Sequence, residues 1–452
     1  IGPAASSESY LRIDRLLEVD ERAGADAVHP GYGFLAERAP FAQAVADAGL
    51  VFVGPRAETI AAMGDKTEAR RRMRDAGVPI VPGLVDPLED AEEALAEATE
   101  IGFPVLLKAA AGGGGKGMRV VEEPGELARA FEGARREALS AFGDGSIYLE
   151  RYLGRPRHVE VQVLGDAHGN VVHLAERECS IQRRHQKLVE EAPSPVLTAE
   201  ERAEMGDAAV RAAQAVSYEG AGTVEFLYQD GEFFFLEMNT RIQVEHPVTE
   251  LVTGLDLVQW QLRVAGGEPL SFGQEHVHLT GHAVECRITS EDPLRNFLPS
   301  TGPVVHLELP TGPGVRWDGG IRAGFEVSLH YDPLLGKLVT WGPDRETAID
   351  RMARALDELV VVGVETSTGF HRRVMQEDDF RAGDLSIRYL EEHPELTNGE
   401  TSRERLRAAA VAAALLEEDD RTRHRSPRIV DGGAPAGAMP GWRRAGWPWR
   451  SR

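Results

Sequence analysis

The sequence has few cysteines: Cys179 and Cys286 are the two in 452 residues. Two cysteines provide neither a disulfide framework nor the ligand spacing of a zinc site. The sequence also lacks an uninterrupted apolar run of about 18 residues, the length that indicates a transmembrane helix. These absences predict a cytoplasmic protein that does not insert into a membrane.

Positive charge is scarce as well, because 50 Lys and Arg residues stand against 73 Asp and Glu residues, a formal net charge of −23. Such an excess of negative charge argues against nonspecific binding to nucleic acid or to an anionic membrane. The remaining composition, with 42% hydrophobic and 27% charged residues, is ordinary for a globular protein. The length exceeds the roughly 250–300 residues of a single core, so we expect two or more domains.

A glycine-rich stretch, KAAAGGGGKGM at 108–118, indicates a loop that binds phosphates. It is not a P-loop, because Gly117 stands where Ser or Thr is required and Ala110 replaces the first glycine. It is not a dinucleotide fingerprint either, because the residues that follow, MRVVEE, predict a strand instead of a helix. The run therefore joins two predicted strands, either as a flap whose N–H groups close over anionic oxygens or as an ordinary hairpin tip.

Two glutamates lie on a predicted hairpin in GTVEFLYQDGEFFFLEMN. A two-residue turn at Asp230-Gly231 would pair Glu225 with Leu236 and send the glutamates to opposite faces. A three-residue loop over 230–232 would instead pair Glu225 with Glu237 on one face, because strand side chains alternate.

Two carboxylates at such close range favour a bound cation. Mg²⁺ prefers oxygen ligands and usually takes one or two carboxylates, and Asn239 offers a third oxygen on the same face. The alternative is two unrelated glutamates at the surface of a sheet. The apolar neighbours Phe226, Phe234 and Leu236 predict a buried sheet, where unpaired charge is costly, so we favour the metal site.

The next segment, NTRIQVEHPVTE, presents alternating polar residues. Arg241, Gln243 and Glu245 would point the same way along an extended chain. A guanidinium fork, an amide donor and a carboxylate together form a cradle for a small acid. The alternative is the salt-bridged edge of a strand.

Taken together, the motifs KAAAGGGGKGM, HVEVQVLGD, AERECSIQRRHQKLVEEAPSP, EMNTRIQVEHPVTE and GHAVECRI resemble the biotin carboxylase component of acetyl-CoA and propionyl-CoA carboxylases. These are ATP-grasp enzymes. The resemblance extends from about residue 1 to 395, and RIQVEHP together with RRHQK is specific to biotin-dependent carboxylases.

The resemblance implies an ATP site in which the glycine run is a mobile lid over the triphosphate. Two lysines would neutralise the phosphates, and the hinge at Glu150 and Leu153 would meet the adenine. The residues that it assigns to the nucleotide are Lys66, Lys108, Gly113, Gly114, Gly115, Met118, Glu150, Leu153, His158, Gln182 and His185. Without the resemblance, Lys66 reads as part of a charged helix over 65–76, whose arginine-rich face should be solvated, and His185 as part of a surface basic cluster.

The resemblance also implies a mechanism. Glu225, Glu237 and Asn239 would hold Mg²⁺ (or Mn²⁺), two ions bridging the β- and γ-phosphates. Bicarbonate would be held by Lys187, Arg241, Gln243 and the backbone of Val244, with Glu245 as the general base. The product, carboxyphosphate, would break to CO₂ and phosphate. Arg287 would stabilise the biotin enolate, and Tyr32 and Gly33 would form the rim where biotin enters.

The implied fold is α/β (α+β), an ATP-grasp fold between an N-terminal Rossmann-like subdomain and a C-terminal subdomain. The predicted parts are a remnant of the N-terminal subdomain over 1–53, a linker helix over 54–80, the glycine-lid subdomain over 81–152, the central part over 153–276, the C-terminal subdomain over 277–398 and a poorly structured tail over 399–452. The family's first strand should precede Ile1, so we expect an N-terminal truncation that removes part of the usual homodimer contact.

The biotin acceptor motif A-M-K-M does not occur, since Pro440 follows Ala438-Met439. We therefore expect biotin on a separate carrier domain or protein, and we expect the carboxyltransferase to be a further partner. Two alternatives stay open. One is a different ATP-grasp ligase, similar to half of a carbamoyl-phosphate synthetase, although the 183–187 and 241–247 motifs argue against it. The other is an inactive fragment that only binds ATP.

Overall fold

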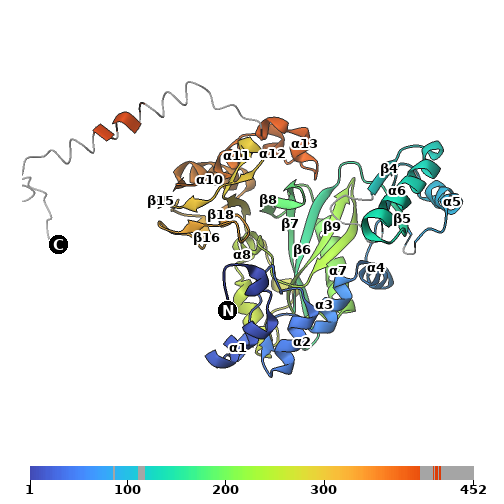
Figure 1. The fold of residues 1–452 in the computed structure, drawn as a ribbon, viewed down its shortest axis with the longest axis horizontal. Coiled ribbons are helices and arrows are strands. Elements are labelled where there is room, and N and C mark those ends of the chain that lie inside the picture. The colour runs from blue at the N-terminus through green and yellow to red at the C-terminus, as the bar shows by residue number, and fades with distance from the viewer. Residues whose placement is uncertain (85–86, 110–117, 398–410, 412, 416, 419–452) are drawn as a thin grey trace, which may run out of the picture. The chain divides into compact units, whose positions relative to one another are not determined.

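The structure is a computed structural model that describes residues 1–84, 87–109, 118–397, 411, 413–415 and 417–418. The chain forms two compact units, Ile1–Asn398 and Gly399–Arg452. The described residues of the second unit are helical. All elements named below belong to the first unit (Figure 1). No described helix is both long and apolar enough to cross a membrane.

The N-terminal part is a short α/β segment. Its elements are α1 (Ile13–Ala23), β1 (Ala27–Val28), α2 (Ala39–Asp47), β2 (Val51–Phe52), α3 (Ala57–Gly64) and α4 (Lys66–Asp75). β1 and β2 pair in parallel. Gly24 ends α1 in the left-handed conformation with φ 64°, as is typical of a glycine after a helix. Asp65 begins α4 by accepting the N–H groups of Thr67 and Glu68.

One face of α4 differs from the prediction of a solvated arginine-rich helix. The side chains of Arg71, Arg72 and Arg74 are 43–52% exposed, as expected. Arg70 is only 21% exposed, because its side chain turns inward toward the next subdomain. The prediction is therefore wrong for this one arginine.

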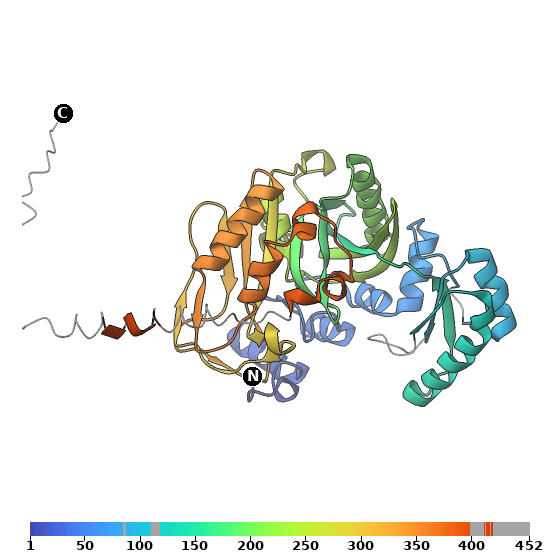
Figure 2. The ribbon, with the colours of Figure 1, turned by 90° about the horizontal axis from the view of Figure 1, so that it is seen from above.

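A small subdomain follows, with α5 (Ala91–Ile101), β3 (Val105–Ala109), β4 (Met118–Val121), α6 (Leu127–Phe142) and β5 (Ile147–Arg151). Its antiparallel sheet has the order β4-β3-β5. The side chains of Val105 and Leu107 point from one face of β3 into a hydrophobic core, which also contains Phe131 of α6. Lys108 therefore lies on the opposite face of β3. Figure 2 shows the subdomain projecting from the larger sheet.

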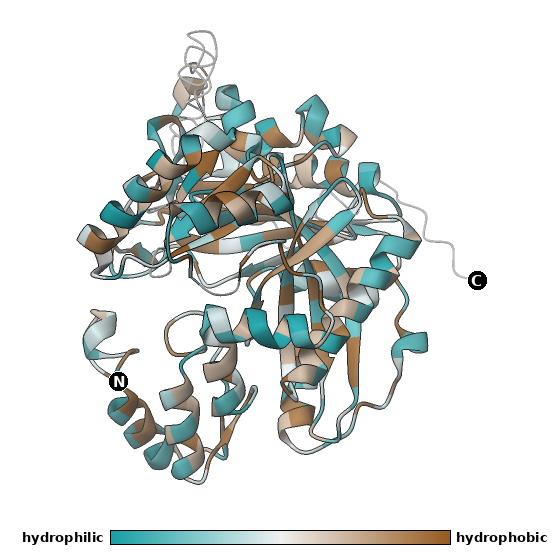
Figure 3. Ribbon diagram, turned by 90° about the vertical axis from the view of Figure 1, so that its right-hand side faces the viewer, coloured by the Kyte–Doolittle hydropathy of each residue, from teal (hydrophilic) through white to brown (hydrophobic). Residues whose placement is uncertain are grey.

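The central feature is an eight-stranded antiparallel sheet with the order β10-β9-β6-β7-β8-β11-β18-β16. Its strands are β6 (Arg157–Gly165), β7 (Val171–Arg183), β8 (Gln186–Ala192), β9 (Gly220–Gln229), β10 (Glu232–Asn239), β11 (His282–Thr289), β16 (Val315–Gly319) and β18 (Leu334–Gly342). The helices α7 (Ala199–Ala215), α8 (His246–Thr253) and α9 (Leu257–Ala265) pack against these strands. In Figure 3 the sheet carries many hydrophobic residues, and the helices combine hydrophilic with hydrophobic residues.

The hairpin of β9 and β10 resolves the question of register in a way that neither sequence alternative anticipated. The turn has two residues, Asp230 and Gly231, both with positive φ, and Gln229 pairs with Glu232. A β-bulge between Phe235 and Glu237 then shifts the register by one residue, so that Glu225 pairs with Glu237. The bulge puts the two glutamates on one face despite the short turn.

The C-terminal part packs helices on the end of the same sheet. Its further elements are β12 (Glu291–Asp292), β13 (Leu298–Pro299), β14 (Gly302–Pro303), β15 (His306–Glu308), β17 (Glu326–Val327), α10 (Arg345–Glu358), β19 (Val360–Val362), α11 (Thr368–Val374), α12 (Asp378–Ala382) and α13 (Tyr389–Glu392). α10 packs against β18 and β11, and a fully buried cluster that includes Met352, Leu356 and Phe370 joins helices to strands.

Candidate active site

Lys187 is the centre of a buried charge cluster on the large sheet. From β8 its Nζ donates to Glu225 Oε1 at 3.0 Å and to Glu245 Oε1 at 2.6 Å, and it also donates to Glu160. Glu160 on β6 lies directly opposite Glu225 on β9, so strand pairing brings these two carboxylates together. Burial lowers the pKa of Lys187, but the three carboxylates outweigh it and raise that pKa well above its usual range.

A second cation, Arg177 on β7, is fully buried and was not among the residues predicted to form the site. Its guanidinium donates to Glu160 Oε1 at 2.7 Å and to Gln243 Oε1 at 2.6 Å. Its other acceptors are Gln162, Thr223 and Thr249. Sequence analysis missed both Arg177 and Glu160, although the alternation of His158, Glu160 and Gln162 with valines on β6 marked a polar face.

Glu245 lies between two cations. It accepts from Lys187 and, on Oε2, from Arg287 NH2 at 2.8 Å, while Arg287 Nε donates to Glu190 Oε1 at 2.5 Å. Burial alone would raise the pKa of Glu245, but the charges of Lys187, Arg287 and Arg177 lower it well below its usual range. Glu245 is therefore a carboxylate, the protonation state that a general base requires.

The predicted metal ligands come together on the β9–β10 hairpin. Glu237 lies opposite Glu225, and Asn239 Nδ2 donates to Glu225 Oε1 at 2.8 Å. Glu237 is exposed as a residue, but desolvation of its carboxylate and then the charge of Glu225 raise its pKa, and a cation would relieve this repulsion. The donor set, two carboxylates and an amide oxygen, suits Mg²⁺. The prediction of a buried setting holds for Glu225 but not for Leu236 and Glu237, which are exposed.

His158 and Gln182, both predicted nucleotide contacts, adjoin this hairpin. Gln182 Nε2 lies 2.8 Å from His158 Nδ1, and His158 Nε2 lies 2.9 Å from Glu225 Oε2. A predicted nucleotide residue thus touches a predicted metal ligand, which is the proximity that a metal bridging two phosphates would require.

The segment after β10 is not the extended run that its alternation predicted. The chain bends at Arg241, and Glu245 lies in a turn that begins α8. Gln243 Nε2 still reaches Glu225 Oε1 at 2.8 Å, and the carbonyl of Val244 accepts from Lys337 at 2.7 Å. Gln243 and Glu245 therefore both reach the cluster around Lys187, because Gln243 donates to Glu225 and Glu245 accepts from Lys187.

Arg241 lies at the bend, and its guanidinium contacts Glu37 and Asn239. Its Nε donates to Glu37 Oε2 at 2.8 Å and its NH2 to Asn239 Oδ1 at 2.8 Å. Its guanidinium is thus tied to a predicted metal ligand and to the N-terminal segment.

A second charged group lies at the small subdomain. Glu150 on β5 is 4% exposed and accepts from Lys108 on one oxygen and from Arg70 on the other. Burial and the charges of Arg70 and Lys66 lower the pKa of Lys108 to about 8. Both predicted phosphate-binding lysines thus lie within electrostatic reach of one another.

The other predicted residues differ in their exposure to solvent. Tyr32 is 40% exposed; burial and the charge of Glu285 raise its pKa while the charge of Arg287 lowers it, so Tyr32 lies within electrostatic range of the arginine predicted to meet biotin. Lys66, Met118 and His185 are exposed, and Leu153 is half-buried. Gly113, Gly114 and Gly115 lie outside the described residues.

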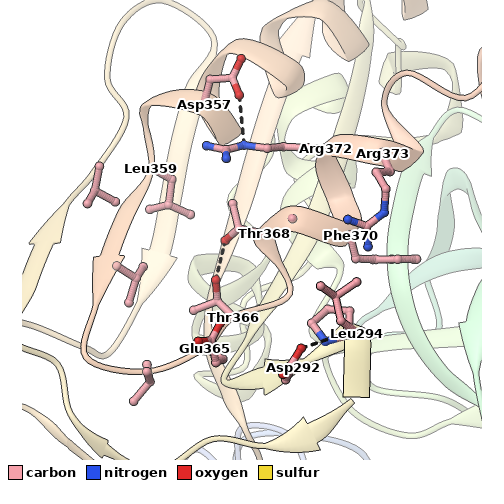
Figure 4. Close-up of a pocket in the computed structure, with 15 residues that line it drawn as sticks. Asp292, Leu294, Asp357, Leu359, Glu365, Thr366, Thr368, Phe370, Arg372 and Arg373 are labelled. Atoms are coloured by element: carbon pink, nitrogen blue, oxygen red, sulfur yellow. Dashed lines mark hydrogen bonds and ion pairs between the residues drawn. The ribbon is translucent and has the colours of Figure 1, made fainter. Parts of the chain in front are cut away.

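A cavity of about 380 Å³ in the C-terminal part contains none of the predicted site residues (Figure 4). Its lining combines apolar side chains such as Leu359 and Phe370 with an ion pair in which Arg372 Nε lies 3.0 Å from Asp357 Oδ1. The buried charge cluster, not this cavity, is therefore the candidate active site.

Comparison with protein families divides the chain into three matched regions. The biotin carboxylase N-terminal domain matches residues 1–60, and the biotin carboxylase C-terminal domain matches residues 285–392. The region between them, residues 65–272, matches the ATP-binding domain of the carbamoyl-phosphate synthase L chain. The flanking matches separate this chain from a carbamoyl-phosphate synthase.

Curated relatives cover most of the chain. A pyruvate carboxylase component from Methanothermobacter thermautotrophicus is 53% identical over 393 residues, 87% of this chain and 80% of that protein. Biotin carboxylase of Haemophilus influenzae is 51% identical over 392 residues, 86% and 87% of the two chains.

Solved structures give the same family. The biotin carboxylase domain of a thermophilic 2-oxoglutarate carboxylase bound to bicarbonate superposes with a TM-score of 0.84 and 46% identity over 88% of each chain. A dimer of the Hydrogenobacter thermophilus domain with MgADP, ADP and bicarbonate has a TM-score of 0.79 and 47% identity, again over 88% of each chain.

Proposed function

This chain belongs to the biotin carboxylase family of ATP-grasp enzymes, and we propose that the cluster around Lys187 and Glu245 is where it carries out the family's reaction. The reaction is the ATP- and Mg²⁺-dependent carboxylation of biotin by bicarbonate. The observation that carries the proposal is the position of Glu245, an ionised carboxylate between Lys187 and Arg287, with Gln243 and the Val244 backbone beside it.

In the first step Glu245 takes the proton of bicarbonate, whose oxygen then attacks the γ-phosphorus of ATP. ADP leaves and carboxyphosphate forms. Lys187 and Arg241 balance the charge of the bicarbonate, and Gln243 orients it. Phosphoryl transfer of this kind depends mostly on positioning and on neutralising charge, which suits a site built from cations and carboxylates.

Glu225, Glu237 and Asn239 would hold the Mg²⁺ of the nucleotide, and the ion would neutralise charge on the β- and γ-phosphates. Lys66 and Lys108 neutralise the phosphates from the other side, and the hinge at Glu150 and Leu153 meets the adenine. His158 would contact the nucleotide next to Glu225, and Gln182 is held beside His158.

In the second step the C–O bond of carboxyphosphate breaks to give CO₂ and phosphate. The phosphate takes the N1′ proton of biotin, and the resulting anion attacks CO₂ to form N-carboxybiotin. Arg287 donates to the ureido oxygen as its negative charge develops. Tyr32, exposed and within electrostatic range of Arg287, would form the entrance for biotin.

Biotin would arrive on a carrier domain or protein, and a carboxyltransferase would consume the product. Relatives of this chain are named as parts of pyruvate and 2-oxoglutarate carboxylases, so the final acceptor differs between enzymes that share this half-reaction. The Hydrogenobacter domain is described as a dimer, and we propose the same pairing for this chain.

The test is ATP hydrolysis by the purified chain with Mg²⁺, bicarbonate and free biotin. We expect hydrolysis to depend on bicarbonate and to rise with biotin, and Glu245→Gln to lower it by about 10²–10⁴-fold, the usual contribution of a general base. Glu250→Gln, in α8, is the matched control. A rate of ATP hydrolysis that does not depend on bicarbonate, or that is unchanged in Glu245→Gln, would refute the proposed role of this site.

A further inference from the structure

Arg70 is a cation that the mechanism above does not use, although its partner Glu150 belongs to the proposed adenine hinge. Arg70 lies on α4, whereas its partner Glu150 lies on β5 of the small subdomain, 80 residues away along the chain. Its NH2 also donates to the carbonyl of Val81 at 3.3 Å. The other arginines of α4 pair within the helix, as Arg71 and Arg72 do with Glu68.

These two contacts place Arg70 at both connections between the small subdomain and the rest of the chain. Val81 lies in the segment that enters the subdomain, and Glu150 lies one residue before the end of β5, the strand that leaves it. The two connections lie side by side, because Gly83 pairs with Glu150 and the Arg151 N–H donates to the carbonyl of Pro82 at 2.8 Å.

Glu150 has two cationic partners, one from each side of this hinge. Lys108 reaches it from β3 of the small subdomain, and Arg70 reaches it from α4. A carboxylate that is 4% exposed needs at least one of them, since an unpaired buried charge costs several kcal/mol. Lys108 cannot leave Glu150 for a phosphate unless another cation stays behind.

We propose that Arg70 is a positioning residue for nucleotide binding, which keeps Glu150 neutralised so that Lys108 is released to the triphosphate. The inference rests on the proposed function in one respect, the assignment of Lys108 to the phosphates of ATP. Arginine suits the role, because its guanidinium stays charged at all working pH values and can hold Glu150 and the Val81 carbonyl at once.

The charges around Lys108 support this division of roles. Glu150 and Tyr148 face it from β5, and Arg70 and Lys66 act on it from α4. Burial first, and then Arg70 and Lys66, lower the pKa of Lys108 to about 8. Removing Arg70 should therefore raise the pKa of Lys108 and bind it more firmly to Glu150.

The experiment compares Arg70→Met with Arg71→Met in the full chain. Two quantities are measured: the Mg-ATP dissociation constant by calorimetry, and KM and kcat of bicarbonate-dependent ATP hydrolysis. We expect Arg70→Met to raise the dissociation constant and KM about 10-fold, the effect of losing one charge-assisted interaction, with kcat within about twofold. Arg71→Met should change none of them, because Arg71 is exposed and its ion pair among the described residues is with Glu68 of the same helix.

Two further readouts separate positioning from a merely structural role. In Arg70→Met the alkaline limit of Mg-ATP binding should move to higher pH, because the pKa of Lys108 rises. Arg70→Lys, which keeps a charge beside Glu150, should recover most of the affinity. A structural role would instead lower the unfolding midpoint and kcat and leave the alkaline limit in place.

Unchanged affinity for Mg-ATP in folded Arg70→Met would overturn the inference. Arg70→Gln is the second variant, used if Arg70→Met does not fold, because glutamine keeps a donor for the Val81 carbonyl but has no charge. We expect it to raise the Mg-ATP dissociation constant as Arg70→Met does. The dissociation constant needs no turnover, so a wild-type chain that binds Mg-ATP without bicarbonate-dependent hydrolysis would refute the proposed function while still testing Arg70. A wild-type chain that binds no Mg-ATP would overturn both.

Discussion

The two ends of the candidate site have opposite charge balance. At the small subdomain, Arg70 and Lys108 bind the single carboxylate of Glu150, with Lys66 close enough to act on Lys108. On the large sheet, the carboxylates of Glu160, Glu190, Glu225 and Glu245 share three cations, Arg177, Lys187 and Arg287.

The difference matches the two ends of the proposed ligand. An excess of cations suits the phosphates of ATP, and an excess of carboxylates beside Asn239 suits the magnesium ions that accompany them. The burial of the two groups also differs. Lys108 is about a third exposed and its pKa is lowered, whereas Lys187 is 11% exposed and its pKa is raised, because only Lys187 has more carboxylates than cations around it.

The largest expected effect comes from removing a cation at the carboxylate-rich end. Arg177→Met would leave Glu160 partly unpaired in a fully buried position. Four further acceptors would also lose the hydrogen bond that Arg177 donates to them. We expect the free energy of unfolding, measured with urea, to fall by about 3–5 kcal/mol.

The control is Arg119→Met at the small subdomain. Arg119 pairs with Glu137 at 3.1 Å, and both side chains are more than 40% exposed. An exposed pair of this kind contributes about 0–1 kcal/mol. Equal losses in the two variants would show that the carboxylate-rich end does not depend on Arg177.

A smaller effect is expected on metal binding. Glu225→Gln removes one carboxylate from the proposed ligand set, so the Mg²⁺ concentration for half-maximal ATP hydrolysis should rise about 10- to 100-fold. Glu232→Gln is the matched control on the same hairpin, because Glu232 is 58% exposed and pairs with Arg151. A Mg²⁺ requirement that moves equally in both variants would contradict the assignment of Glu225.

The smallest effect concerns pH and two adjacent glutamates of β8. Burial and the charge of Glu245, opposed by Arg287, raise the pKa of Glu190 to about 7. Burial would also raise the pKa of Glu191, but hydrogen bonding from His282 and the charge of Arg345 lower it to about 2. A single titrating group changes stability by at most about 1.4 kcal/mol per pH unit.

The signs of the two contributions are opposite. The contribution of Glu190 is complete below its ordinary pKa of 4.5 and is lost as the pH rises toward 7, because the folded state binds the proton more tightly. The contribution of Glu191 is complete above pH 4.5 and is lost as the pH falls toward 2. In the wild-type chain the urea midpoint should therefore decline as the pH rises from 4.5 to 7 and as it falls from 4.5 to 2. Glu190→Gln should remove the first decline, and Glu191→Gln should remove the second. Unaltered slopes would contradict these pKa shifts.

Much of the site followed from local sequence. The two apolar runs around Asp230-Gly231 predicted the hairpin that carries Glu225, Glu237 and Asn239, and the family was identified from motifs that the comparisons then confirmed. The roles of individual residues in that site stay predictions. Predictions from residues close together in the sequence are reliable within a regular strand, because their spacing sets which face of the strand they share.

The tertiary structure decided what spacing could not. The bulge before Glu237 pairs the two glutamates despite the two-residue turn. Arg177 donates to acceptors on β6, β9, α8 and the turn before α8. Arg70 points away from solvent, unlike the other arginines of α4, and contacts Glu150. Periodicity tells which way a side chain points but not which distant strand lies opposite. A buried charge must find its partner wherever the fold brings one within reach, and that choice is made only when the sheet and the small subdomain are assembled.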